Sequence, residues 1–71
     1  MSQSDEDKLK VLLDYWIKHN SEHGEEFREW AEKARSMGKA SVHDQLLSAA
    51  GEMEKVNESL ASALEWLERV G

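Results

Sequence analysis

Apolar residues return at alternating intervals of four and three positions along most of this chain, and no proline interrupts them. This spacing matches the 3.6-residue turn of an α-helix, whereas a half-buried strand alternates apolar and polar residues. Two such stretches are present, and they meet near Gly38. The sequence therefore predicts an all-α protein with two long helices.

The first stretch predicts a helix over about residues 5–37. Ser4 precedes three acidic residues, which is typical of a helix N-terminus, and Gly38 suits the left-handed position that often ends a helix. The stripe expected to face the core comprises Leu9, Leu13, Trp16, Asn20, His23, Phe27, Trp30, Ala34 and Met37. Aromatic residues at this spacing usually pack in a core, so we expect Trp16 and Trp30 to be buried.

The second stretch predicts a helix over about residues 42–70. Ser41 and Asp44 have the spacing of a capping box, with Asp in place of the usual Glu. The apolar stripe of this helix comprises Val42, Leu46, Ala49, Met53, Val56, Leu60, Ala63, Leu67 and Val70, and it is widened by Leu47, Ala50, Ala61 and Leu64. So broad an apolar face exceeds what a single neighbouring helix covers.

A connection of two or three residues between long helices requires an antiparallel arrangement, so residues 1–71 are expected to form one helical hairpin domain. A chain of this size buries a small core and gains stability from a partner. We expect two hairpins to associate as a homodimer, giving a four-helix bundle. The alternative is a single hairpin that docks on a larger protein partner.

The charge balance argues against two classes of partner. The 15 acidic and 9 basic residues give a net charge of −6, which disfavours both nucleic acid and anionic membrane surfaces. The sequence has no cysteine and no apolar run long enough to span a bilayer, and its N-terminus is unlike a signal peptide. We therefore expect a cytoplasmic protein without thiol chemistry.

The residue types best suited to chemistry lie in the middle of the first helix. His19 and His23 are four residues apart, and Glu26 follows three residues later, so all three lie on one narrow face. Two imidazoles and a carboxylate suit nickel or zinc, with Glu22 beside them as a further candidate ligand. A second copy of the chain, or Glu58 from the second helix, could complete the coordination shell.

The competing interpretation makes these polar residues structural. Asn20 and His23 fall on the stripe that should face the core, and Asn57 is a potential partner on the second helix. A polar layer within a helical bundle sets the register and orientation of the helices at some cost in stability. Under this interpretation the protein is an interaction scaffold or adaptor.

An enzymatic role is not expected. Residues 19–23 match the H-x-x-E-H pattern of some zinc peptidases, but such enzymes need a third ligand and a substrate cleft on a larger scaffold. His43 lies too far along the hairpin to share a metal with His23, and we interpret it as a surface residue. Gly24 sits directly after His23, where it either permits close approach or is simply tolerated in a long helix.

The stretch from Tyr15 to Ala31, YWIKHNSEHGEEFREWA, resembles a family of small, largely uncharacterised two-helix domains of anaerobic bacteria and archaea. Members share a W-I-x-H-N-x-E-H-x-x-x-F-x-x-W-A core followed by a second helix rich in Leu, Ala and Glu. The matching positions are Trp16, His19, Asn20, Glu22, His23, Phe27 and Trp30, and the resemblance covers residues 9–67. It implies a two-helix domain with a suspected association with transition-metal handling.

Overall fold

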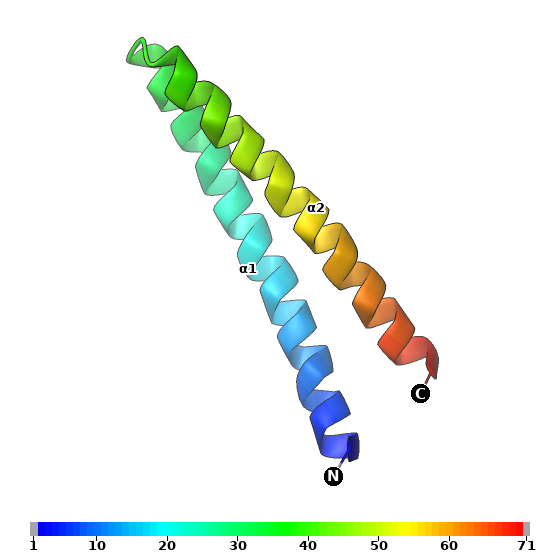
Figure 1. Cartoon of the computed structure of the whole chain (residues 1–71). Coiled ribbons are helices and arrows are strands. Elements are labelled where there is room, and N and C mark those ends of the chain that lie inside the picture. Colours follow the sequence, from blue (N-terminus) through cyan, green and yellow to red (C-terminus); the bar gives the residue numbers. More distant parts are fainter. Residues whose placement is uncertain (1, 71) are drawn as a thin grey trace.

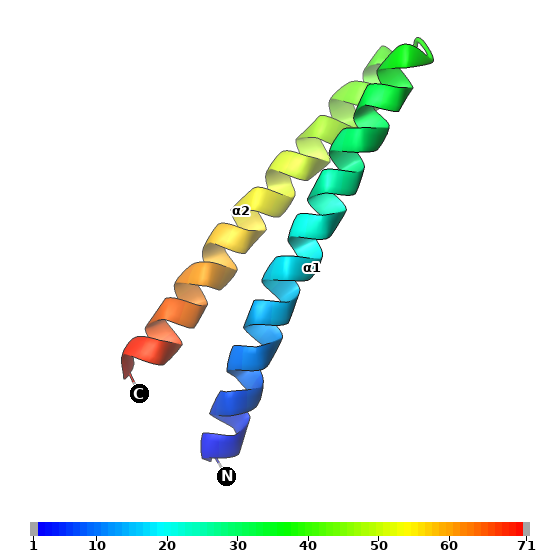
Figure 2. The same ribbon diagram turned by 180° about the vertical axis from the view of Figure 1, so that it is seen from behind.

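The computed structural model describes residues 2–70, including the side chains of residues 5–69. Two helices, α1 (Ser2–Ser36) and α2 (Ala40–Val70), run antiparallel along their whole length (Figures 1 and 2). The predicted all-α antiparallel hairpin is therefore confirmed. Its radius of gyration is 16.2 Å, against about 11 Å for a compact domain of this length. Neither helix carries, within the described residues, an apolar segment long enough to cross a membrane.

The turn between the helices is closed by backbone hydrogen bonds. The amide of Lys39 donates to the carbonyl of Ala34 at 2.9 Å, and the amide of Gly38 donates to the carbonyl of Arg35 at 3.0 Å. This pair of bonds defines a Schellman motif, in which the residue after the helix adopts a left-handed conformation. Gly38 has a φ of 76° and fills that position, as predicted.

Both helices begin earlier than the sequence suggested. Helix α1 begins at Ser2, so the backbone of Ser4 lies inside its first turn; the side chain of Ser4 lies outside the described residues. Helix α2 begins at Ala40, because the Lys39 carbonyl already accepts the first helical bond, from the amide of His43 at 3.0 Å. Lys39 is therefore the N-cap residue, and the predicted capping box of Ser41 and Asp44 is wrong.

The seam between the helices is made of small side chains. The buried apolar residues are Leu13, Ala31, Ala34 and Ala50, and Gly24 is buried as well. Small residues let two helix backbones approach closely, which leaves no room for an indole ring between them. Trp16 and Trp30 accordingly lie on the flank of α1, 39% and 53% exposed, and the prediction that they are buried is wrong for this hairpin.

The hairpin tapers toward its turn, because the distance between the two helices increases from the turn to the chain ends. They lie closest near the connection and separate toward the termini in both views (Figures 1 and 2). Near the turn the fully buried residues are alanines, with His43 and Leu46 half-buried beside them. Toward the open end the buried or half-buried apolar side chains are larger: Leu13, Ile17, Leu60, Leu64 and Leu67.

A polar layer crosses the middle of the hairpin. The Nδ2 atom of Asn20 donates to Oδ1 of Asn57 at 3.1 Å, so the predicted pairing of these two side chains is confirmed. His23 does not belong to this layer, because its side chain lies on the flank of α1 and is 41% exposed. His43 was expected at the surface, yet its side chain is only 15% exposed and contacts Oδ1 of Asp44 at 3.0 Å.

Candidate metal site

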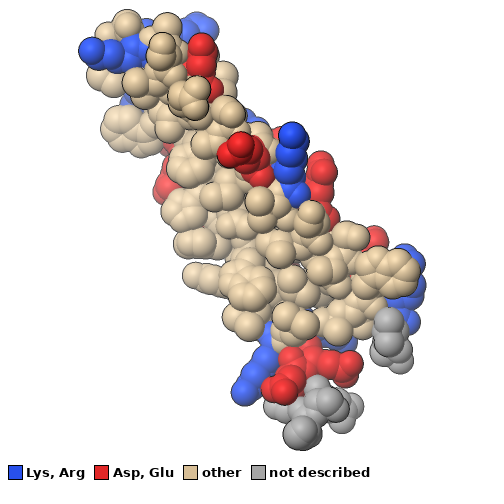
Figure 3. All heavy atoms as spheres, viewed as in Figure 1, with Lys and Arg blue, Asp and Glu red and all other residues tan. Residues whose placement is uncertain are grey.

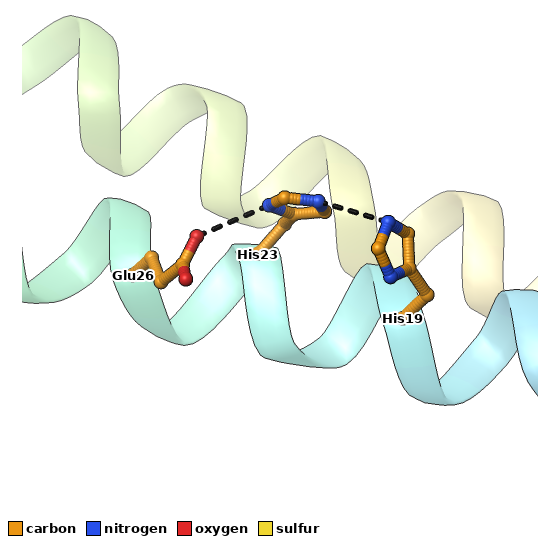
Figure 4. Close-up of polar contacts among 3 residues, drawn as sticks. All are labelled: His19, His23 and Glu26. Atoms are coloured by element: carbon orange, nitrogen blue, oxygen red, sulfur yellow. Dashed lines mark hydrogen bonds and ion pairs between the residues drawn. The ribbon is translucent and has the colours of Figure 1, made fainter.

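His19 and His23 point toward one another on the flank of α1 (Figure 4). They are one helical turn apart, and their Nε2 atoms lie 3.0 Å from each other. The two rings meet almost at right angles, with centroids 4.4 Å apart and an interplanar angle of 88°. This arrangement directs one nitrogen of each imidazole into a shared space.

Glu26 contacts the other ring nitrogen of His23, Nδ1. Its Oε1 atom lies 3.1 Å from Nδ1 of His23, so a proton on Nδ1 donates to the carboxylate (Figure 4). A neutral imidazole protonated at Nδ1 carries its lone pair on Nε2. The carboxylate therefore favours the tautomer in which Nε2 of His23 accepts a hydrogen bond from the Nε2–H of His19.

Aromatic rings flank the two histidines along the helix. Tyr15 stacks on His19, with ring centroids 5.4 Å apart and planes 15° from parallel. Phe27 lies against the other side of His23, with centroids 6.2 Å apart and planes 24° from parallel. These contacts run at intervals of four residues, so the helix itself aligns the column. Packing on both sides restricts the rotamers of the imidazoles and keeps their Nε2 atoms together.

The separation of the Nε2 atoms is close to that of two ligands on one metal ion. Imidazole nitrogens bound tetrahedrally to zinc at about 2.0–2.1 Å lie about 3.3 Å apart. The observed 3.0 Å between His19 and His23 differs from this by a few tenths of an ångström, which a small rotation of either ring removes. The two nitrogens thus share a hydrogen bond at a spacing that two ligands of one metal ion could also adopt.

A third ligand is not assembled within the hairpin. Among the described residues, no group of three or more His, Cys, Asp or Glu side chains is close enough together to hold a metal ion. Glu26 contacts the nitrogen of His23 that faces away from His19, and Glu22 is exposed beside the pair. Of the four residues selected from the sequence, His23 contacts two, His19 through Nε2 and Glu26 through Nδ1.

An extensive apolar surface surrounds the histidines. Residues that are seven apart occupy the same side of a paired helix, so Trp16, His23 and Trp30 share one flank of α1. Arg28 and Ser21 mark the opposite flank, because Arg28 pairs with Glu54 and Ser21 accepts a hydrogen bond from Asn57. The large apolar residues that α1 exposes on the histidine side are Leu9, Leu12, Trp16, Trp30 and Met37.

Helix α2 extends this surface across the hairpin. Glu54 contacts Arg28 on the far side, and Leu47 is one heptad away on that same side of α2. Val42 and Val56, which expose about half of their surfaces, therefore lie on the histidine side. We call this surface the histidine face, defined by the five apolar residues of α1 together with His19, His23, Val42 and Val56. A broad surface free of Asp, Glu, Lys and Arg spans both helices in Figure 3.

The opposite side of the hairpin is polar. It contains a hollow of about 210 Å³, lined by Asn20, Ser21, Gly24, Glu25, Arg28, Ala50, Met53, Glu54 and Asn57. Arg28 and Glu54 form an ion pair with each other there, and the side-chain amide of Asn57 donates hydrogen bonds to α1. The two sides of the hairpin therefore differ in character, and the histidines lie on the apolar one.

Comparison with known proteins assigns the chain to a family. Residues 9–67 match the family described as a domain of unknown function, DUF8180. The chain belongs to the DUF8180 family. The match covers the same residues, 9–67, as the family resemblance described above. Comparison with curated proteins and with solved structures gave no match.

Tyr15 is a site residue that the sequence reasoning did not select. It stacks on His19 and closes the aromatic column at its N-terminal end. The signal was present in the sequence, since Tyr15, His19, His23 and Phe27 follow one another at intervals of four. Phe27, which was expected in the core, also packs against His23.

Proposed function

We propose that this DUF8180 domain is a small, non-enzymatic metal-binding module for zinc or nickel. The observation that carries the proposal is the 3.0 Å separation of the Nε2 atoms of His19 and His23. Both metals accept imidazole nitrogen, and both occur with histidine ligands in proteins. The net charge of −6 also favours attraction of a divalent cation.

Glu26 supports the proposal through its contact with Nδ1 of His23. A metal-bound histidine usually donates its second N–H to a carboxylate or carbonyl, which fixes the tautomer and strengthens the ligand. In this scheme Glu26 positions His23 while the two Nε2 atoms bind the metal. Glu22, three residues from His19, supplies a further carboxylate where the metal takes an oxygen ligand.

Isothermal titration of the metal-free protein with Zn²⁺ and with Ni²⁺ tests the proposal. We expect saturable binding that is lost in the double variant His19→Ala/His23→Ala, with helicity unchanged because both side chains lie on the flank. His43→Ala is the matched control, since it removes an imidazole outside the site. Binding by the wild type no tighter than that of the double variant would refute the proposal.

We also propose that two hairpins associate through the histidine face into a four-helix-bundle homodimer. The chain exposes 5455 Å², whereas a compact monomer of this mass exposes about 4,500 Å². The excess of about 1,000 Å² is close to the roughly 800 Å² that each partner buries in a standard interface. Antiparallel helices with heptad spacing pack readily into such a bundle.

A protein-interaction scaffold is the second candidate function, and the exposed histidine face favours it. An apolar surface of this extent commonly marks a site of protein association. Under this alternative Asn20 is an internal polar residue that fixes helix register, and His23 contributes no ligand. His23→Leu should then preserve partner binding, whereas the metal module loses its site in the same variant.

A further inference from the structure

We infer that a single metal ion is shared by two copies of the chain, held by His19 and His23 of each, and that metal binding and dimerisation are therefore coupled. This inference rests on the proposed metal-binding function and names the partner that completes the site. The first argument is the number of donors. One hairpin brings two imidazole nitrogens together at 3.0 Å, and zinc in a closed site takes four ligands.

The second argument is the position of the histidines on the histidine face. The exposed apolar residues of α1 on this side run from Leu9 to Met37, and His23 is midway between them in sequence. A symmetric dimer can cover the whole face with a two-fold axis that crosses the face at this midpoint. An axis in the interface, perpendicular to the helices at this level, places each histidine pair opposite its copy.

The third argument is charge. A divalent ion in an apolar interface must be neutralised, because an uncompensated buried charge is costly. Four neutral imidazoles leave the charge of the ion uncompensated. Each hairpin, however, adds one Glu26 carboxylate in contact with a ligating histidine. Two copies thus supply two negative charges for one divalent cation, one from each Glu26.

The test combines stoichiometry with oligomeric state on the full chain. Metal-free protein is titrated with Zn²⁺ by calorimetry, and its mass is followed by sedimentation equilibrium with and without zinc. We expect one zinc per two chains and a dimer that zinc tightens by about tenfold or more. X-ray absorption of the zinc-loaded protein should count four imidazole nitrogens per metal.

A matched pair of variants separates the interface from the ligands. Val56→Glu places a charge on the histidine face, whereas Leu47→Glu places one on the opposite side. The wild-type side chains are 46% and 42% exposed, so neither change disturbs a buried position. We expect Val56→Glu to weaken both dimerisation and zinc binding by about tenfold or more, with both histidines intact, because coupling is reciprocal. Leu47→Glu should alter neither.

The outcomes distinguish this inference from the proposed function. One zinc per monomeric chain, two imidazoles per zinc, or unchanged zinc affinity in Val56→Glu would overturn the shared site and leave the metal-binding function standing. Absence of zinc binding by the wild type would overturn both. One zinc per dimer with four imidazoles, together with the expected difference between the two variants, supports the shared site.

Discussion

The side chain of Asn57 is bonded to α1 at three points. Its Oδ1 atom accepts from Nδ2 of Asn20, while its own Nδ2 donates to the carbonyl of Ile17 and to Oγ of Ser21, each at 3.1 Å. A sliding of one helix past the other would break all three bonds at once. Most other buried or half-buried residues of the seam are apolar and make no such directional bonds, so this asparagine fixes the register of the two helices.

Replacing Asn57 with Leu should lower the free energy of unfolding by about 1–3 kcal/mol, because Asn20 is left half-buried without its partner. Urea unfolding followed by circular dichroism measures this. The double variant Asn20→Leu/Asn57→Leu should recover much of the loss, since an apolar pair needs no hydrogen bond. A single variant as stable as the wild type would show that the bonds contribute no net stability.

Gly24→Ala should stabilise the protein, by up to about 1 kcal/mol, through the higher helix propensity of alanine. An added Cβ atom would lie 3.8 Å from Cβ of Met53 and 3.9 Å from Nη1 of Arg28, which are ordinary contacts. Gly51→Ala is the control, because nothing lies within 4 Å of its added Cβ. The midpoint temperature of thermal unfolding should rise in both variants. A decrease confined to Gly24→Ala would mean that the helices must approach more closely than they do here.

Gly38→Ala should destabilise the hairpin by about 1 kcal/mol, because a side chain at positive φ is strained. The φ of 76° places this residue in the left-handed region, while the space around its Cβ position is open. Gly38→Asn should cost less, since Asn tolerates this conformation better than Ala. Equal midpoints of denaturation for the wild type and Gly38→Ala would contradict the assignment of strain to the backbone.

Glu26→Gln should weaken zinc binding by about 10–100-fold without removing a ligand. The amide is a weaker acceptor for the Nδ1–H of His23, and the change removes the negative charge beside the proposed metal site. Glu29→Gln makes the same chemical change one turn further along, at an exposed position away from the histidines. Competition with a chromogenic zinc chelator compares the two. Equal affinities would show that Glu26 has no part in positioning His23.

The architecture followed from the sequence because it depends on patterns that act locally. Helical periodicity defined both helices to within a few residues, and the left-handed glycine at position 38 located the turn. Helix starts were less accurate, because the Schellman turn leads into α2 before the serine expected to cap it. Such a start depends on the conformation of the preceding turn, which residue type alone does not specify.

The side of each helix that faces the core was harder to predict than the helices themselves. The sequence placed Trp16 and Trp30 inward on grounds of hydrophobicity, whereas the structure exposes both and buries Ala31, which lay off the predicted stripe. Leu13 and Ala34, which were also placed inward, are buried as predicted. The side of α1 that packs against α2 depends on how closely the two backbones approach. That distance depends on the side chains of both helices together. For the same reason His23 lies on the flank of α1 and not in the core, and there it contacts His19 and Glu26.

The taper of the hairpin has a consequence for how the chain folds. The tightest part of the seam, at Ala31, Ala34 and Ala50, is also the part nearest the turn in sequence. Contacts that close the shortest loops cost the least chain entropy and form first. The two helices should therefore zip together from Gly38 outward and fray in the reverse order. Amide hydrogen exchange would then be slowest beside the turn and accelerate steadily toward both chain ends.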